Sequence, residues 1–426
     1  MNRLLALAIA AAVIGSTATA MAQESQTPDL RTALPTNVTI DDVLRLLNER
    51  SPRTVADRAT VDVVAADRIT AGTYPNPSVS YGGVHLVSGL STGAITQHQL
   101  VFDQPLLIFR QRQARLGAAD LNVAAEDARV AEILGGRRLQ VRQAFATLLS
   151  RQQQLVVFQE SLADLERVES VVRGRAEAGE RSEYDVARIE TETETLRVEM
   201  MNADADVDDA SGQLAALLGL PGWSPRAVGG LQPASDVPTD FDVLWTTAQQ
   251  RRPSLVAVRQ QQAAARGGLF LAQRERLPVP AFSGGTQITQ NVSGTSTFFG
   301  FSMPLPLFDH NQGAIARANA QIRAQSLALE AEMAEAHAEI ERATTVLAKR
   351  REALNALEAR VFQRIPMLRR MSEDAYREGG ADILELLDAM RSVKEIQIAH
   401  VQQLESSKLA EEVVVSVSGL DAPGGK

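Results

Sequence analysis

Apolar residues recur every three, four or seven positions along two long stretches of the chain. The first stretch runs from Leu116 to Val172 and the second from Ile322 to Val361. A repeat of about 3.5 residues sustained over many heptads is typical of helices packed as coiled coils. At roughly 1.5 Å per residue, a helix over 110–173 would form a rod of about 95 Å, and a helix over 311–376 would be much the same length.

Each rod is interrupted once, and each is followed by a glycine-marked turn and a shorter returning helix. We expect local bends rather than helix ends at Gly135-Gly136 and at Pro366. The pattern therefore predicts long helical hairpins over about 110–218 and 311–418. Two modest helices precede each hairpin and are candidates to extend the cover of the rods. They lie around 40–72 and 240–276.

Pairs of short strand-like segments separate the modest helices from the rods. The segments span about 78–87, 95–104, 281–290 and 295–303. In "TSTFFGFSM" the residues Phe299, Phe301 and Met303 fall on one face, and Ser296, Gly300 and Ser302 fall largely on the other. The alternation is poorer in the first pair. Strands of about ten residues with one apolar face are the signature of a transmembrane β-barrel, but the pattern also fits two soluble hairpins.

The whole arrangement occurs twice. Five pairs of segments match in the same order at offsets close to 200 residues, and "EAGERSEYDVAR" (177–188) with "REGGADILELLD" (377–388) is one of them. Collinear matches of this kind indicate an internal tandem repeat. We therefore predict a mainly α chain with a small β part, in which a first repeat spans 23–230 and a second spans 231–426.

The first 22 residues have the features of a cleaved signal peptide. Arg3 supplies a short positive region, "LLALAIAAAVIG" (4–15) is a short apolar core, and Ala20 and Ala22 precede Gln23. A buried N-terminal helix is the alternative interpretation. No later stretch of 18 apolar residues occurs, so we expect the mature chain either in solution in an exported compartment or in a membrane as β-strands.

Composition narrows the function further. The net charge is −9 without a concentrated basic patch, so we expect no nucleic-acid partner. Aromatic residues make up only 4% of the chain, while alanine, leucine, glutamate, arginine and glutamine dominate, which fits long helices better than compact enzymes. The chain has no cysteine, which excludes disulfides, thiolate metal sites and a lipid-modified N-terminal cysteine.

No constellation of residues predicts catalysis. The sequence contains no G-x-S-x-G, no H-E-x-x-H and no phosphate-binding glycine loop. Its five histidines are scattered without ligand-like spacing. His85 and His98 fall in the two strands of the first hairpin, where they either face each other as a metal site or occupy polar loop or lumen positions. We therefore assign no catalytic, cofactor-binding or metal-binding residue.

The duplicated pattern, "YPNPSVSYG" (74–82) and "PLPLFDHNQG" (304–313) together carry a family likeness. Over essentially the whole mature chain the sequence resembles the TolC-type outer-membrane factors, the exit ducts of Gram-negative efflux pumps and type I secretion. The segment 304–313 is most similar to the heavy-metal-resistance branch, whose members work with metal-exporting pumps of the resistance-nodulation-division class.

The resemblance implies a homotrimer in the outer membrane. Each subunit would give four strands to one twelve-stranded barrel in outer-membrane lipid, and its helices would form a hollow α-barrel in the periplasm. Such a duct passes its substrate, with heavy-metal cations as a candidate, from the periplasm to the exterior without chemical conversion. The implied partners are a periplasmic adaptor (membrane fusion protein) and an inner-membrane pump of the resistance-nodulation-division class.

The strand-to-helix junctions follow from the chemistry of proline and of capping residues. Pro105, Pro304 and Pro306 are expected to stop the strands because proline cannot extend the sheet ladder. In the second half the junction continues with Asp309, Asn311, Gln312 and Gly313, of which Asp309 and Asn311 are good N-cap residues. The first half lacks such a residue in "FRQRQ" (109–113), so its cap is expected to be poorer.

The turns that close the two hairpins are candidate docking tips for the adaptor. They comprise Gly179, Glu180, Arg181 and Ser182 in the first half, and Gly379, Gly380, Ala381 and Asp382 in the second. Glycine permits a positive φ at the end of the ascending helix, and serine or aspartate caps the descending one. A trimer of duplicated chains would present six similar tips, which suits a hexameric adaptor.

Glu373 and Asp374 are candidates for an acidic periplasmic gate of the kind that relatives carry near their tips. Arg369 and Arg370 stand beside them, so the alternative is that these charges solvate a helix end. Two other classes of protein also remain: a secreted coiled-coil scaffold without a pore, and a periplasmic adaptor. An adaptor would show a single hairpin and a lipoyl-like β-domain, which the duplicated hairpins and four strands disfavour.

Overall fold

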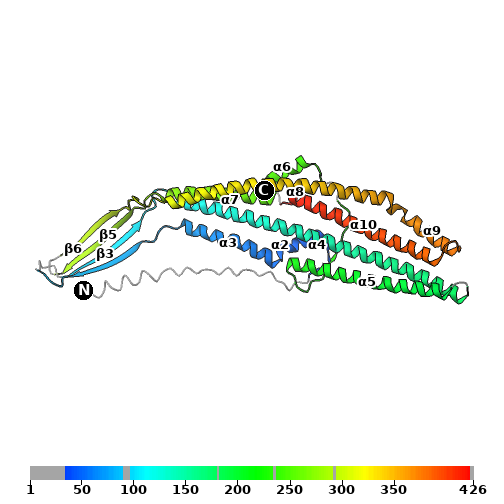
Figure 1. Cartoon of the computed structure of the whole chain (residues 1–426). Coiled ribbons are helices and arrows are strands. Elements are labelled where there is room, and N and C mark those ends of the chain that lie inside the picture. Colours follow the sequence, from blue (N-terminus) through cyan, green and yellow to red (C-terminus); the bar gives the residue numbers. More distant parts are fainter. Residues whose placement is uncertain (1–33, 90–95, 180–181, 234–236, 291–293, 423–426) are drawn as a thin grey trace. The chain divides into compact units, whose positions relative to one another are not determined.

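The computed structural model describes residues 34–89, 96–179, 182–233, 237–290 and 294–422. The expected signal peptide, 1–22, lies outside the described residues. From Pro35 onward the chain forms one unit. As the sequence predicts, this unit is mainly helical and contains a small antiparallel sheet (Figure 1).

The same order of long elements appears in both halves of the chain. The first half contains β1 (Asn37–Val38), α2 (Ile40–Glu49), α3 (Pro52–Gly72), β2 (Ser78–His85), β3 (Thr96–Pro105), α4 (Gln111–Glu177) and α5 (Glu183–Leu218). The second half contains β4 (Arg226–Ala227), α6 (Phe241–Arg251), α7 (Pro253–Glu275), β5 (Ala281–Gln290), β6 (Gly294–Ser302), α8 (Gln312–Arg360), the 3₁₀ turn η1 (Phe362–Arg364), α9 (Ile365–Arg377) and α10 (Ile383–Val417).

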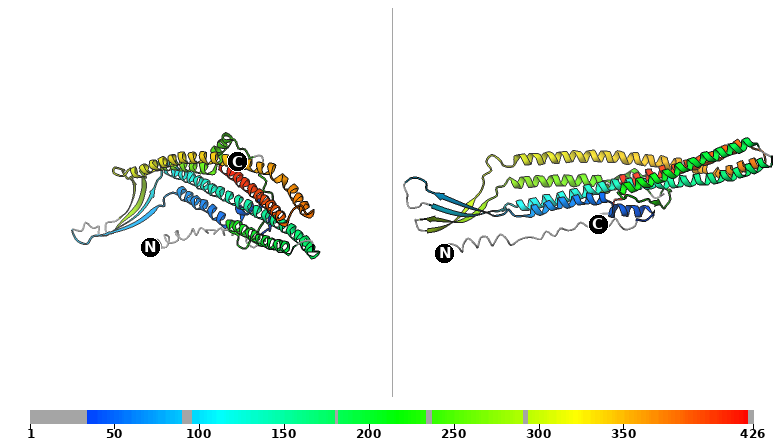
Figure 2. Two further views of the ribbon diagram at one scale, coloured as in Figure 1. Left: turned by 45° about the vertical axis from the view of Figure 1, so that its right-hand side comes forward. Right: turned by 90° about the horizontal axis from the view of Figure 1, so that it is seen from below.

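The lateral order of the strands continues into the lateral order of the helices. The sheet order is β2-β3-β5-β6, with every neighbouring pair antiparallel. Each strand is joined in sequence to one helix, and these helices pack in the matching order α3-α4-α7-α8 (Figures 1 and 2). The four-stranded sheet and the helical layer therefore have the same two outer members, β2 with α3 and β6 with α8.

The shorter helices are stacked end to end beside the long ones. Both α3 and α5 pack along α4, and both α7 and α10 lie between α4 and α8. A Cβ atom on Gly219, just after α5, would lie 3.3 Å from Cδ of Pro52, which begins α3. A Cβ atom on Gly419, just after α10, would lie 2.8 Å from the backbone of Arg251 and Arg252, which precede α7. The two modest helices of each half thus extend the cover of the rods, as the sequence predicts.

The 67-residue helix α4 is the element against which most of the others pack. At 1.5 Å per residue it is about 100 Å long, and it runs unbroken through Gly135-Gly136. Toward the hairpin turn its buried positions are leucines and valines of the predicted heptad repeat, such as Leu148 and Leu162. Nearer the sheet alanines take these positions, which lets α7 approach so closely that a Cβ on Gly267 would lie 2.6 Å from Leu121.

The prediction of a mere bend at Pro366 is wrong. The helix α8 ends at Arg360, a 3₁₀ turn follows, and α9 begins at Ile365 with Pro366 in its first turn. A proline inside a helix removes a hydrogen bond and its ring clashes with the preceding turn, whereas a proline in the first turn costs neither. The chain therefore restarts the helix one residue ahead of the proline.

The two strand-to-helix junctions have the same backbone geometry, which the sequence did not predict. The residue before α4 is Arg110 and the residue before α8 is Asn311, and each has φ of 64°. Among the described non-glycine residues these are the ones with positive φ. The next residue is glutamine in both cases: the side chain of Gln111 accepts from the N–H of Phe109 at 3.0 Å, and that of Gln312 accepts from His310 at 3.0 Å.

The expectation that Asn311 caps α8 with its side chain is therefore wrong, although Asn311 does occupy the N-cap position. Its Nδ2 instead donates to the carbonyl of Ala272 on α7 at 2.8 Å, while Asp309 accepts from its backbone N–H at 2.9 Å. The strands end where the prolines predict, β3 at Pro105 and β6 at Ser302, two residues before Pro304. The first junction lacks a conventional cap, but so does the second.

The shared left-handed geometry gives a prediction about stability. An arginine in the left-handed backbone conformation destabilises the folded state by about 1 kcal/mol relative to an asparagine, which adopts this conformation more readily. We expect Arg110→Asn to stabilise the protein by roughly 0.5–1 kcal/mol, and Asn311→Val to destabilise it, as measured by the midpoint of denaturant unfolding. Gln113→Asn, an exposed change three residues further along, serves as the control. A lower midpoint for Arg110→Asn would contradict the strain at this position.

Candidate functional site

Large apolar side chains cover one face of the sheet and remain exposed in the single chain. The strand registers place them together across all four strands, and we call this the apolar face. It carries Val79, Tyr81, Leu100, Phe102, Phe282, Ile288, Phe299 and Phe301. Their exposed fractions run from 39% at Leu100 to 78% at Phe299. The predicted alternation of Phe299 and Phe301 with Ser296, Gly300 and Ser302 is confirmed.

The opposite face of the sheet is lined mainly by hydroxyl, amide and glycine residues, and we call it the polar face. Its members by the same registers include Ser78, Ser80, Gln97, Gln99, Asp103, Ser283, Gln287, Ser296 and Ser302. Phe298, Val84 and Val101 are apolar exceptions on this face. Phe298 is the largest of them. The ring of Phe298 lies over Gly285, where a Cβ atom would stand 2.7 Å from Phe298 Cζ and 2.3 Å from the carbonyl oxygen of Leu100.

The first hairpin has the same two faces, although its sequence alternates poorly. Tyr81 and His98 share the apolar face, and the Tyr81 hydroxyl and His98 Nδ1 lie 2.7 Å apart. His85 and His98 do not lie opposite each other: His98 is paired with Gly83, and His85 with Thr96, whose hydroxyl lies 2.8 Å from His85 Nδ1. Within the described residues no group of three or more potential metal-ligating side chains is found. Each of the two histidines instead lies within hydrogen-bonding distance of a hydroxyl group on the neighbouring strand.

Both hairpin turns have the local geometry that the sequence predicts. Gly179 and Gly379 each have φ of 78°. Ser182 accepts from the N–H of Asp185 at 3.3 Å, and Asp382 accepts from that of Glu385 at 2.8 Å and forms a full capping box. Glu180 and Arg181 lie outside the described residues. A Cβ atom on Gly179 or on Gly379 would meet no described heavy atom within 4 Å, so only the backbone angle demands glycine there.

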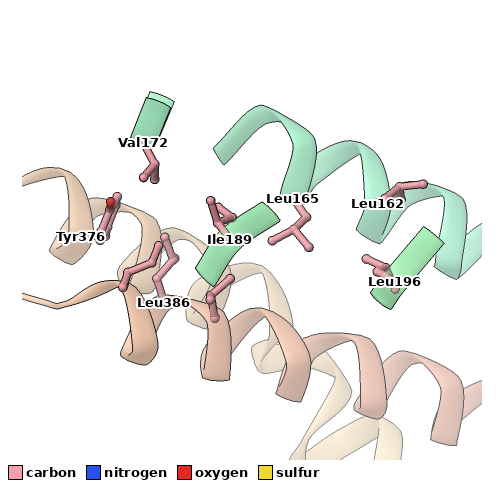
Figure 3. Packing of buried hydrophobic residues seen from close by; sticks show 9 residues of the cluster. Leu162, Leu165, Val172, Ile189, Leu196, Tyr376 and Leu386 are labelled. Atoms are coloured by element: carbon pink, nitrogen blue, oxygen red, sulfur yellow. The ribbon is translucent and has the colours of Figure 1, made fainter. Parts of the chain in front are cut away.

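The ends of the two hairpins pack on each other through one apolar cluster. It combines Leu162, Leu165 and Val172 from α4 with Ile189 and Leu196 from α5, Tyr376 from α9 and Leu386 from α10 (Figure 3). Burial of side chains of this size contributes about 1.5–3 kcal/mol each. The cluster fixes the position of the tip of one hairpin relative to the other.

Ion pairs between the two hairpins lie beside this cluster. Arg369 pairs with Asp164, Arg391 with Glu192 at 2.8 Å, and Lys394 with Glu199 at 2.5 Å. The hydrogen bond from Arg391 to Glu192 raises the pKa of that guanidinium. The partners are about 200 residues apart in sequence, and nothing in the local pattern of either helix indicated them.

The two candidate gate carboxylates differ in their surroundings. Asp374 is exposed and pairs with Arg377 at 3.5 Å on the same helix. Glu373 is half-buried and borders a hollow that also includes Arg175, Tyr376 and Arg377. In the single chain the two carboxylates therefore do not form one acidic site. Arg369, which is near them in sequence, forms an ion pair with Asp164 on α4 instead.

None of the described helices combines the length and the apolar character required to cross a bilayer.

Comparisons with known proteins agree with this architecture. Residues 244–420 match the family model described as outer membrane efflux protein. The chain is 25% identical over 210 residues to the cobalt-zinc-cadmium resistance protein CzcC of Cupriavidus metallidurans, a match that spans 49% of this chain and about half of that relative. Two solved structures share the fold, each over 89% of this chain and each with a TM-score of 0.70. They are the outer-membrane channel OprN, at 19% identity over 89% of its length, and CusC, at 16% identity over 92% of its length.

The family match falls on the second half of the chain, from α6 to the end of α10, and the shared fold extends over both halves. In its second half the chain is therefore similar to the outer membrane efflux protein family, and over 89% of its length it shares the fold of OprN and CusC.

Proposed function

We propose that this chain is the outer-membrane exit duct of a tripartite efflux pump, through which substrate passes from the periplasm to the exterior without chemical change. The observation that carries the proposal is the amphipathic four-stranded sheet, which is open at both edges and continuous with a layer of helices, of which α4 is about 100 Å long. The known fold of the family supports it.

The sheet cannot be complete in a single chain. Among the described residues β2 pairs only with β3, and β6 pairs only with β5. Unpaired backbone groups at a sheet edge are costly in hydrocarbon, where each must find a partner inside the protein. The apolar face supplies the surface that lipid would contact, and the polar face supplies one that water would contact. Three copies would give a closed barrel of twelve strands, with the apolar face outward.

The helical layer is open at the same two edges. Among the described residues of α3 only Thr54 is buried, and Val63 and Ile69 are 70% and 74% exposed. On α8, Ala318 is the one buried residue before Ala336, so the part of the helix nearer the sheet is poorly covered in the single chain. A neighbouring copy that extends the sheet next to β6 would bring its own α3 beside α8. One symmetric contact therefore completes both layers.

The rival classes leave these surfaces unexplained. A secreted scaffold would keep the apolar face of the sheet in water, and exposed apolar patches of this kind mark interaction surfaces. A periplasmic adaptor would use one helical hairpin, whereas this chain has two that pack together through the cluster of Figure 3.

The cargo and partners proposed for the duct come from the relatives. The name of the curated relative refers to cobalt, zinc and cadmium, so we propose divalent metal cations as cargo, delivered by a metal-exporting inner-membrane pump. A periplasmic adaptor would dock on the turns around Gly179–Ser182 and Gly379–Asp382. Glu373 and Asp374 would contribute to a gate just inside these turns.

Assembly is the first test of the proposal. We expect the mature protein to fractionate with the outer membrane and, after extraction in detergent, to size as a stable trimer. Deletion of the gene should lower tolerance to cobalt, zinc or cadmium, and the wild-type gene should restore it. A folded, stable monomer in detergent would contradict the proposed duct.

The apolar face gives a second test. Phe299→Arg or Phe301→Arg would place a charge toward lipid, at a cost of about 2–4 kcal/mol near the bilayer midplane. We expect a much reduced yield of membrane-inserted trimer, measured by heat-modifiable migration on gels. Ser302→Arg, on the polar face of the same strand, is the matched control and should be tolerated better. Equal yields on both faces would show that the assignment of the faces is wrong.

The hairpin turns give a third test. Gly179→Val and Gly379→Val place a β-branched residue at a φ of 78°, a conformation that such residues rarely adopt. Because no described atom crowds either position, the damage should stay local to the turn. We expect a normal trimer in the outer membrane, together with lost adaptor crosslinking and lost metal efflux. Full crosslinking and full efflux in the double variant would rule out these turns as the docking site.

A further inference from the structure

One charged residue stands in the strand part of the molecule. Between residues 78 and 105 and between residues 281 and 302, Asp103 is the only aspartate, glutamate, lysine or arginine in the sequence. This includes the two segments of these ranges whose structure is not described, so the count is complete for both hairpins. Asp103 lies on β3, two residues before that strand ends at Pro105.

The strand registers place Asp103 on the polar face. It is paired with Ser78 on β2 and with Ser283 on β5, and Ser283 is paired with Gly300 on β6. One row across the sheet therefore reads serine, aspartate, serine, glycine. Side chains directly opposite each other in a sheet have Cβ atoms about 4.5–5.5 Å apart, so the two serines are the nearest neighbours of Asp103 on this face across the sheet.

In the part of the chain that the structure describes, no lysine or arginine is paired with this carboxylate. Among the described residues Asp103 takes part in no salt bridge, and its own sheet carries no lysine or arginine that could reach it. The side chain is half-buried, and the row ends at Gly300, whose missing side chain leaves the Ser283 hydroxyl uncovered: a Cβ there would lie 2.8 Å from it. The neighbours of this negative charge across the sheet are thus uncharged residues.

We propose that Asp103 is a specificity-determining residue that makes the strand part of the duct selective for cations. The inference rests on the proposed function, because it needs the polar face to line a water-filled pore. A charge on a wall of low dielectric constant attracts counter-ions and raises their local concentration. Rings of carboxylates act in this way in cation channels. In a trimer, Asp103 of each subunit would form such a ring, and the hydroxyls of Ser78 and Ser283 would offer further weak oxygen contacts.

The proposal explains why this charge is placed here. An exit duct for metal cations needs a site that attracts cations but also releases them. One carboxylate from each subunit, beside uncharged residues, would bind a metal ion more weakly than a site with several charged ligands. The ring would act on charge rather than on metal identity. Cobalt, zinc and cadmium ions would therefore all be admitted, and anions would be disfavoured.

The test uses the full-length trimer in planar lipid bilayers. Wild-type channels are expected to show a reversal potential that favours potassium over chloride in a salt gradient. Hexaamminecobalt(III), added on the side opposite the helical hairpins, is expected to block the current. Asp103→Asn and Asp103→Ser should each raise the half-blocking concentration about tenfold and shift the reversal potential toward zero. Asp103→Glu should stay close to wild type.

A relocated charge provides the rescue. Gln99 lies four residues before Asp103 on the same face of β3, so Gln99→Asp in the Asp103→Asn background should restore the block. Asp204→Asn, which removes an exposed carboxylate on α5, should leave the block from the strand side unchanged. Wild-type protein that forms no conducting channel would contradict the proposed function itself. Conducting channels in which Asp103→Asn and Asp103→Ser keep the wild-type block and reversal potential would overturn only the role of Asp103.

Discussion

The structure depends on one constraint: each strand of the sheet is continuous with one helix of the layer beside it, so both layers share the same lateral order. The sheet runs β2-β3-β5-β6 and the helices run α3-α4-α7-α8. An open edge in one layer is therefore an open edge in the other. A sheet edge in lipid must be paired, and the copy that pairs it must also supply the helix that covers the flank. In the proposed trimer, closure of the barrel and closure of the helical tube would therefore be the same event.

The junctions make this coupling possible. At each one a proline ends the strand pairing, a residue in the left-handed region turns the chain, and a glutamine side chain satisfies a backbone N–H before the helix begins. The same geometry in both halves sends the two long helices, α4 and α8, away from the sheet in equivalent ways. Arginine tolerates the left-handed conformation less well than asparagine does, so the first junction carries more strain than the second.

Much of the fold could be predicted from local chemistry, because the signals lie within a few residues of one another. The heptad repeat predicted the long helices. A glycine followed by Ser182 or Asp382 predicted the turns, and the spacing of Phe299 and Phe301 predicted which face of β6 is apolar. Other features depend on partners far apart in sequence. The faces of the first hairpin become clear only through the pairing of Tyr81 with Leu100, and Arg369 finds Asp164 across about 200 residues. At Asn311 the residue type suggested a capping side chain, but a carbonyl on α7 competes for it.

The claim that matters most is that β2 of one copy pairs with β6 of the next. The chain has no cysteine of its own, so single cysteines can be introduced on the polar face without interference, at Ser78 or Ser80 on β2 and at Ser296 or Ser302 on β6. Each combination would be placed in one chain, and the protein would be oxidised in isolated outer membranes and separated on denaturing gels. The account predicts that at least one combination gives covalent dimers and trimers and nothing larger. Absence of crosslinks in every combination, or a ladder that continues beyond three copies, would contradict it.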